Sequence, residues 1–124
     1  MRYLLNDEGM SELREDILKY MSALTGASGA KTYSTAYDFI AYAKRNKKNG
    51  GAILEIMGLF LNDLLHGQGG GEYSADIQTA VKMLDVYVKY RKMINANGNY
   101  SACMECMILG LCEITQSSAE TSPT

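Results

Sequence analysis

Three cysteines near the C-terminus have the clearest chemical spacing in the chain. Cys103 and Cys106 form a CxxC pair, the spacing of zinc ligands and of redox-active thiols. Cys112 lies nine residues after Cys103, on the opposite side of a helix, and no second CxxC completes a four-ligand site. Free cysteine is often buried, and here the neighbours are methionine, isoleucine and leucine. We expect core packing and no metal, with a small metal or redox protein using Cys103 and Cys106 as an alternative.

A second set of polar side chains lies on the apolar stretch Gly51–Gly67. At about 100° per residue, Glu55, Asn62 and His66 fall within a narrow arc of a helix, with Asp63 at its edge. A carboxylate, an amide and an imidazole on one face are the groups of an acid–base or metal site. An amphipathic helix also needs one polar strip, however, and this strip is the only one available. His66 is the only histidine, so we expect the strip simply to face water.

The glycine-rich segment Gly67–Gly71 does not match a phosphate-binding loop, because no lysine follows it before Lys82. It precedes a predicted helix, whose N-terminus can hold a phosphate, but we expect a plain connection. The chain also lacks a nucleophile elbow, an HExxH sequence, EF-hand spacing and a paired-acid motif. We therefore predict that the protein is not an enzyme, with no catalytic residues and no cofactor.

Two basic segments are the best candidates for direct ligand contact. Residues 31–50 hold five lysines and arginines against one acid, and residues 77–98 hold four against one. Tyrosines lie near both, and cations beside aromatic rings can hold a phosphate backbone and stack bases. Cations at a helix C-terminus also suit the helix dipole, so a solvated surface is the simpler interpretation. The candidate nucleic-acid-binding residues are Lys44, Arg45, Lys47, Lys48, Lys82, Lys89, Arg91 and Lys92.

Helices must position these residues, because composition and periodicity both favour an all-α chain. The one proline is Pro123, valine is scarce, and apolar residues recur at intervals of three and four. Glycine and asparagine clusters separate the periodic segments, and the asparagine–glycine cluster at residues 95–99 predicts a helix end and a turn. The predicted helices cover residues 6–26, 35–46, 51–67, 75–96 and 102–115.

The first, second and fourth predicted helices are amphipathic. The first is predicted to bury Met10, Leu13, Ile17, Met21 and Leu24. The second follows a connection at residues 26–32, is capped by Thr32 or Ser34, and is predicted to bury Ala36, Tyr37, Ile40, Ala41 and Ala43. Its Phe39 and Tyr42 point to another side, so we expect it to contact two neighbours. The fourth is predicted to bury Ile77, Ala80, Val81, Leu84, Tyr87, Val88 and Ile94.

The third and fifth predicted helices are apolar almost all round, which is typical of helices at the centre of a bundle. Between residues 52 and 65 the polar residues are Glu55, Asn62 and Asp63. We therefore predict an all-α fold, a single compact domain of about five helices with two nearly all-apolar central helices. This domain spans residues 1–115, and residues 116–124 have the composition of a disordered tail.

Length, charge and cysteine usage limit the class of protein. A chain of 124 residues suits one domain, and a net charge of −2 favours neither a strongly basic nor a strongly acidic partner. Three clustered cysteines are not a disulfide framework, so we expect a reducing compartment and a cytoplasmic location. The first ten residues do not resemble a signal peptide, and no apolar run reaches the ~18 residues of a membrane span.

The leading functional hypothesis is a non-enzymatic protein-interaction module. Two apolar helices are a large surface for three amphipathic helices to cover, and the eight methionines are typical of adaptable surfaces. We expect an adaptor, inhibitor or assembly subunit that binds a protein partner, itself or both, as a homodimer or larger homo-oligomer. The alternative is a small helical subunit that binds nucleic acid through residues 44–48 and 82–92. The residue usage, rich in Lys, Asn, Tyr and Met, suits a viral, phage or mobile-element protein.

Overall fold

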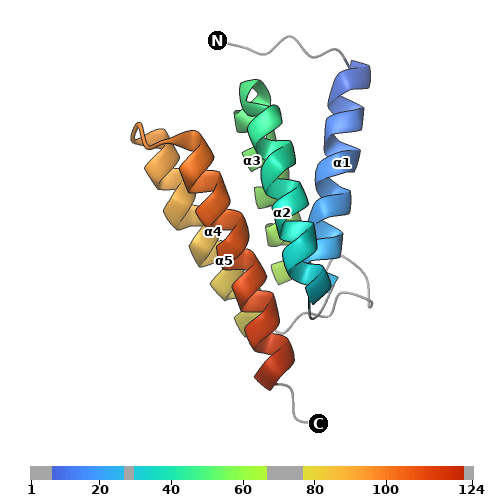
Figure 1. Cartoon of the computed structure of the whole chain (residues 1–124), viewed down its shortest axis with the longest axis vertical. Coiled ribbons are helices and arrows are strands. Elements are labelled where there is room, and N and C mark those ends of the chain that lie inside the picture. Colours follow the sequence, from blue (N-terminus) through green and yellow to red (C-terminus); the bar gives the residue numbers. More distant parts are fainter. Residues whose placement is uncertain (1–6, 27–29, 67–76, 122–124) are drawn as a thin grey trace.

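The protein is a bundle of five α-helices. The computed structural model describes residues 7–26, 30–66 and 77–121, with side chains for residues 9–26, 32–66 and 78–115. The helices are α1 (Asp7–Gly26), α2 (Ala30–Arg45), α3 (Gly50–Leu65), α4 (Ile77–Asn95) and α5 (Tyr100–Thr121), and a short 3-10 helix, η1 (Lys47–Asn49), joins α2 to α3. Successive helices run in opposite directions (Figure 1), and no strand occurs among these residues. The predicted all-α fold is confirmed.

Four of the helices form a closed ring around the core. In this ring α1 packs against α3, α3 against α4, α4 against α5, and α5 against α1. The fifth helix, α2, lies against α5 and α1. The two apolar helices, α3 and α5, therefore share α1 and α4 as neighbours, and both contribute fully buried side chains to one core.

The stripe predicted for α1 is confirmed. Its side chains at positions 13, 17, 21 and 24 are buried and Met10 packs against them, while Glu12, Arg14, Glu15 and Lys19 are exposed. On α3, Ile53, Met57 and Leu61 are fully buried. Apolar spacing of three and four residues was therefore sufficient to find the inner faces of these helices.

The predicted buried face of α2 is wrong in part. Tyr37 is 61% exposed and Ala41 is exposed, whereas Phe39 is fully buried and Tyr42 is 8% exposed. Tyr20 of α1 explains the difference, because its ring stacks on Phe39 at 5.0 Å and lies tilted at 5.2 Å from Tyr42. Burial of the aromatic cluster between α1 and α2 is thus more favourable than burial of Ala41. The helix α2 contacts two other helices, α1 and α5, as predicted.

The start of α2 was also predicted too late. The helix begins at Ala30, so Thr32 and Ser34 lie inside it and are not its N-cap. Thr32 is fully buried. Alanine and lysine at positions 30 and 31 favour helix, so the helix includes residues before Thr32.

On α4 the predicted stripe is too wide. Tyr87 and Ala80 are buried as predicted, but Val81 and Val88 are each 42% exposed, and Met83 is buried instead. The helix packs between α3 and α5, so its inner arc is centred on Tyr87 and Met83. The two valines lie about 100–120° round the helix from Tyr87, at the outer edge of this arc.

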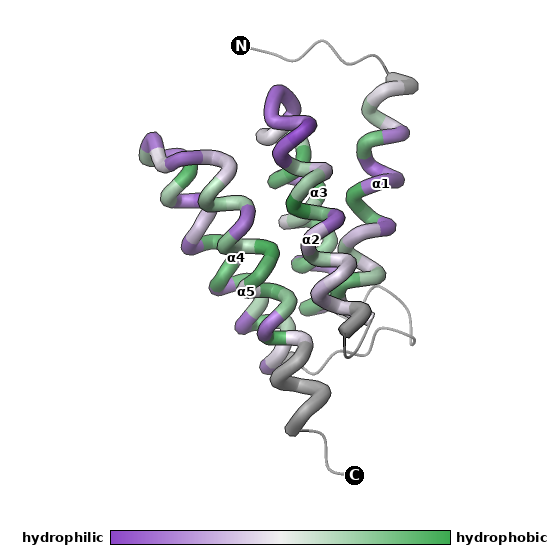
Figure 2. The backbone as a smooth tube through the Cα atoms, viewed as in Figure 1, coloured by the Kyte–Doolittle hydropathy of each residue, from purple (hydrophilic) through white to green (hydrophobic). Residues whose placement is uncertain are grey.

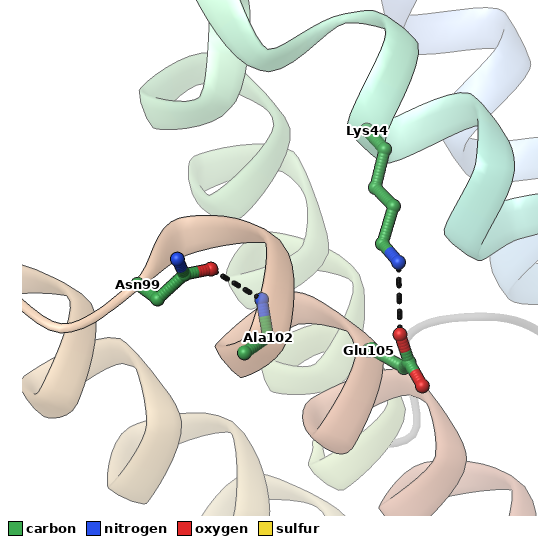
Figure 3. Close-up of polar contacts among 4 residues, drawn as sticks. All are labelled: Lys44, Asn99, Ala102 and Glu105. Atoms are coloured by element: carbon green, nitrogen blue, oxygen red, sulfur yellow. Dashed lines mark hydrogen bonds and ion pairs between the residues drawn. The ribbon is translucent and has the colours of Figure 1, made fainter.

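The turn between α4 and α5 is closed by backbone hydrogen bonds. Asn97 has a left-handed φ of 71°, and the Gly98 N–H donates to Met93 O at 2.7 Å. Asn99 then caps α5, because its Oδ1 accepts a hydrogen bond from the Ala102 N–H at 2.8 Å (Figure 3). This is a Schellman-type end followed by an Asn N-cap, and it confirms the predicted turn at residues 95–99.

The last helix is longer than the predicted 102–115. It continues to Thr121, two residues before Pro123, so the first six residues of the predicted tail continue the helix and residues 122–124 lie outside the described part. A helix that has already formed extends at low cost into residues such as Gln116, Ala119 and Glu120. None of the described helices is both long enough and apolar enough to cross a membrane.

Candidate interaction surfaces

The polar strip of α3 faces solvent, as predicted. Glu55, Asn62, Asp63 and His66 are all exposed. His66 is the C-cap residue, and its Nδ1 lies 2.9 Å from Asn62 O, a contact that satisfies the helix end. No group of three or more metal-ligating side chains gathers anywhere in the described part of the chain. The strip is thus the wet side of a core helix.

The CxxC pair is divided between the inside and the outside of α5. Cys103 is 6% exposed, Cys106 is exposed, and Cys112 is fully buried. Burial, and then the neighbouring Glu113, raise the pKa of the Cys112 thiol, which keeps it protonated and unreactive. The three sulfur atoms therefore do not face one site, and Cys103 and Cys112 serve as core side chains. The predicted connection at residues 67–71 lies outside the described residues.

The first basic segment forms a corner at the end of α2. Lys44 Nζ lies 2.8 Å from Glu105 Oε1 of α5 (Figure 3), and this pair is exposed. Arg45, Lys47 and Lys48, together with Asn46 and Asn49, line an open hollow of about 590 Å³. Among the residues described, none of these three cations forms an ion pair. We call Arg45, Lys47 and Lys48 the basic corner.

The second basic segment has a different arrangement. Arg91 Nη1 donates to Tyr87 Oη at 3.0 Å, and its guanidinium lies 5.8 Å from the Tyr87 ring centroid, so this cation is part of the α3–α4 contact. Lys82 and Lys92 are exposed but ten residues apart, about 15 Å along the axis. The two segments therefore lie on different helices, α2 and α4, which both pack against α5. The predicted candidate residues therefore include one compact cluster and one dispersed set.

Exposed aliphatic residues mark the outer side of α3 and α4, and this surface was missed from the sequence. Leu59 is 60% exposed, and Val81 and Val88 flank the half-buried Leu84. Leu59 lies inside the polar strip of α3. Because its side chain is apolar, a count of hydrophobic residues nevertheless assigns it to the core. The sequence signal was its position in the same arc as Glu55 and His66, four residues after the former and seven before the latter.

Exposed tyrosines mark α2. Tyr37 is 61% exposed and Tyr33 is 39% exposed, one turn apart on the same side of the helix. Two of the buried or half-buried tyrosines donate hydrogen bonds across the fold: Tyr42 Oη donates to Asp16 Oδ2 at 2.9 Å, and Tyr100 Oη donates to Ala43 O at 3.2 Å. Burial raises the pKa of Tyr100 to about 12. Tyr37 thus differs from the structural tyrosines in both exposure and bonding.

The polar and apolar surfaces occupy different parts of the bundle. Figure 2 shows hydrophilic residues gathered at the end where α2 passes into α3 and α4 turns into α5.

Comparison of the chain with protein-family models, curated protein sequences and solved structures gives no significant match. The function is therefore inferred from these surfaces alone.

Proposed function

We propose that the protein is a non-enzymatic interaction module that self-associates through the outer side of α3 and α4. The observation that carries this proposal is the exposure of Leu59, Val81 and Val88 around Leu84. Aliphatic side chains exposed together on adjacent helices are typical of surfaces that bind another protein. The dispersed positions of the cysteines and of His66 also support a function without catalysis.

Helix geometry supports one continuous surface. Tyr87 fills the space beside Gly58, where an added Cβ would lie 2.5 Å from Tyr87 Oη, and this fixes the line of contact between the helices. The helices α3 and α4 run in opposite directions (Figure 1). Two residues, one on each helix, that follow the line of contact by the same rotation therefore lie on the same side of the helix pair. Leu59 and Val88 are the next residues after Gly58 and Tyr87, about 100° past the line in each case.

Charge complementarity favours a second copy of the chain as the partner. Residues 50–65 of α3 carry two acids, Glu55 and Asp63, and no lysine or arginine. Residues 78–95 of α4 carry four cations and one acid, Asp85. A two-fold axis parallel to the helices places α3 of each copy against α4 of the other, so acidic residues face basic ones and Leu59 faces the valines.

Sedimentation tests this proposal with a matched pair of variants. We expect the wild-type chain to have about twice its mass of 13.6 kDa, and Leu59→Lys to raise the dissociation constant at least about 30-fold, the ~2 kcal/mol of a central contact. Leu18→Lys is the control, because Leu18 of α1 is 37% exposed on a different helix and should leave the mass unchanged. A wild-type chain that stays monomeric at high concentration contradicts the proposal.

A charge exchange tests the arrangement of the two copies. Glu55→Lys should weaken the dimer by repulsion from the partner copy's basic helix, and adding Lys92→Glu should restore part of the affinity. If the double variant is no tighter than Glu55→Lys alone, α3 does not face α4 of the second copy.

A further inference from the structure

We propose that α2 and the basic corner bind single-stranded nucleic acid, with tyrosines of α2 stacking on bases and the basic corner holding phosphates. This surface lies away from the outer side of α3 and α4, and the inference does not depend on self-association. It is carried by two separate observations: Tyr37 is 61% exposed, and three cations line one hollow without an ion-pair partner among the residues that the structure describes.

The aromatic part is the side of α2 that carries Tyr33 and Tyr37. They are four positions apart, so they lie about 6 Å apart along the helix axis, on one side of the helix. Tyr37 is 61% exposed, and no hydrogen bond of its hydroxyl is described. Flat rings presented to solvent in a row can stack on successive unpaired bases, which duplex DNA does not offer.

Lys44 continues the tyrosine side of α2, and the basic corner follows it at the end of the helix. Lys44 lies 11 residues after Tyr33, about 20° away in rotation, and its ammonium is already held by Glu105. The basic corner follows directly, so a strand lying along α2 passes from the tyrosines to the three cations. These three residues, with Asn46 and Asn49, line the hollow of about 590 Å³, and no carboxylate is among its lining residues.

The acidic residues nearby set the limit of the surface. Glu12 and Asp16 of α1 line a neighbouring hollow of about 340 Å³, which shares Asn46 and Asn49 with the basic one. Asp16 accepts the hydrogen bond of Tyr42 and is therefore engaged within the fold. A phosphate backbone is repelled from this side, so the strand is confined to the side of α2 that bears the tyrosines.

Fluorescence anisotropy with labelled poly-dT and poly-U of about twenty nucleotides tests the inference. We expect both to bind, with log affinity falling against log salt at a slope of about −2, the value for three phosphate contacts on a single strand. Replacing Arg45, Lys47 and Lys48 together by glutamine should lower affinity at least tenfold and flatten the slope. The matched control, Lys82→Gln with Lys89→Gln on α4, should change neither by more than about twofold.

The tyrosine separates nucleic acid from other anionic partners. Tyr37→Ala should weaken binding by about 5- to 150-fold, the ~1–3 kcal/mol of one stacked base, without changing the salt slope, and Tyr37→Phe should retain affinity. No binding at low salt, or binding that survives Tyr37→Ala unchanged, overturns the inference. Equal affinity for heparin or for vesicles of anionic lipid also overturns it, because those ligands offer no bases to stack.

Discussion

The two contacts that α4 makes, with α3 and with α5, are fixed in different ways. The chain passes from α4 to α5 through a short turn whose hydrogen bonds set the relative position of the helices. It passes from α3 to α4 through residues 67–76, which include four glycines. There a side chain sets the position: Tyr87 Oη donates to Leu54 O at 2.5 Å and occupies the space left by Gly58.

This comparison shows where a helical bundle needs a specific polar contact. A tight turn allows few positions of one helix along the next, whereas apolar contacts alone allow several, one turn or about 5.4 Å apart. Apolar side chains are tolerant of such a shift. A buried hydroxyl is not, because it loses its acceptor and remains unsatisfied.

The largest expected effect is on the free energy of unfolding, when one glycine at each of the two contacts of α4 is replaced by alanine. Gly58→Ala places a Cβ 2.5 Å from the bonded Tyr87 hydroxyl, so we expect the free energy of unfolding to fall by about 1–3 kcal/mol. Gly110→Ala places a Cβ 3.0 Å from Val86 Cγ1, a side chain that can move, and alanine favours helix by about 1 kcal/mol. We expect this variant to be neutral or slightly stabilised. Urea titration of both variants measures the difference, and equal losses contradict the comparison.

The sequence was informative about contacts within a helix or turn and much less about contacts between distant segments. Asparagine and glycine at 95–99 predicted the turn, because the determinants are local. The role of Gly58 could not be predicted, since its cause is Tyr87, 29 residues further on. Likewise, the exposure of Tyr37 follows from the stack of Phe39 on Tyr20 of α1, which periodicity along α2 does not contain.

The second prediction concerns the turn that fixes α5. Asn99→Ala removes the side-chain acceptor of the Ala102 N–H and should lower the free energy of unfolding by about 1 kcal/mol. Asn97→Gly should be neutral or stabilising, because glycine adopts a φ of 71° without steric cost. Thermal unfolding followed by circular dichroism measures both. A loss of stability in Asn97→Gly would show that the asparagine side chain, and not only its backbone, holds the turn.

The smallest expected effect concerns the tyrosines on the two sides of the bundle at alkaline pH. Burial raises the pKa of Tyr87, but Arg91 opposes the shift through its charge and its hydrogen bond. Burial raises the pKa of Tyr100 to about 12 with no cation to oppose it. Each hydroxyl stays neutral in the folded protein while the unfolded chain ionises near pH 10, so each contribution is present below pH 10 and is lost as the pH rises towards the folded-state pKa.

Removing these hydroxyls should therefore affect alkaline unfolding unequally. Tyr100→Phe should move the midpoint of alkaline unfolding to higher pH by a few tenths of a unit, after correction for any change in its free energy of unfolding at pH 7. Tyr87→Phe should move this midpoint less, because Arg91 already stabilises the ionised form of Tyr87. At pH 7 the same variant should lower the free energy of unfolding by about 0.5–1.5 kcal/mol, because the hydrogen bond to Leu54 O is lost. Titration from pH 8 to 12 followed by circular dichroism measures both. A larger alkaline shift for Tyr87→Phe would mean that Arg91 does not neutralise the contact, and that burial alone governs how α3 and α4 respond to pH.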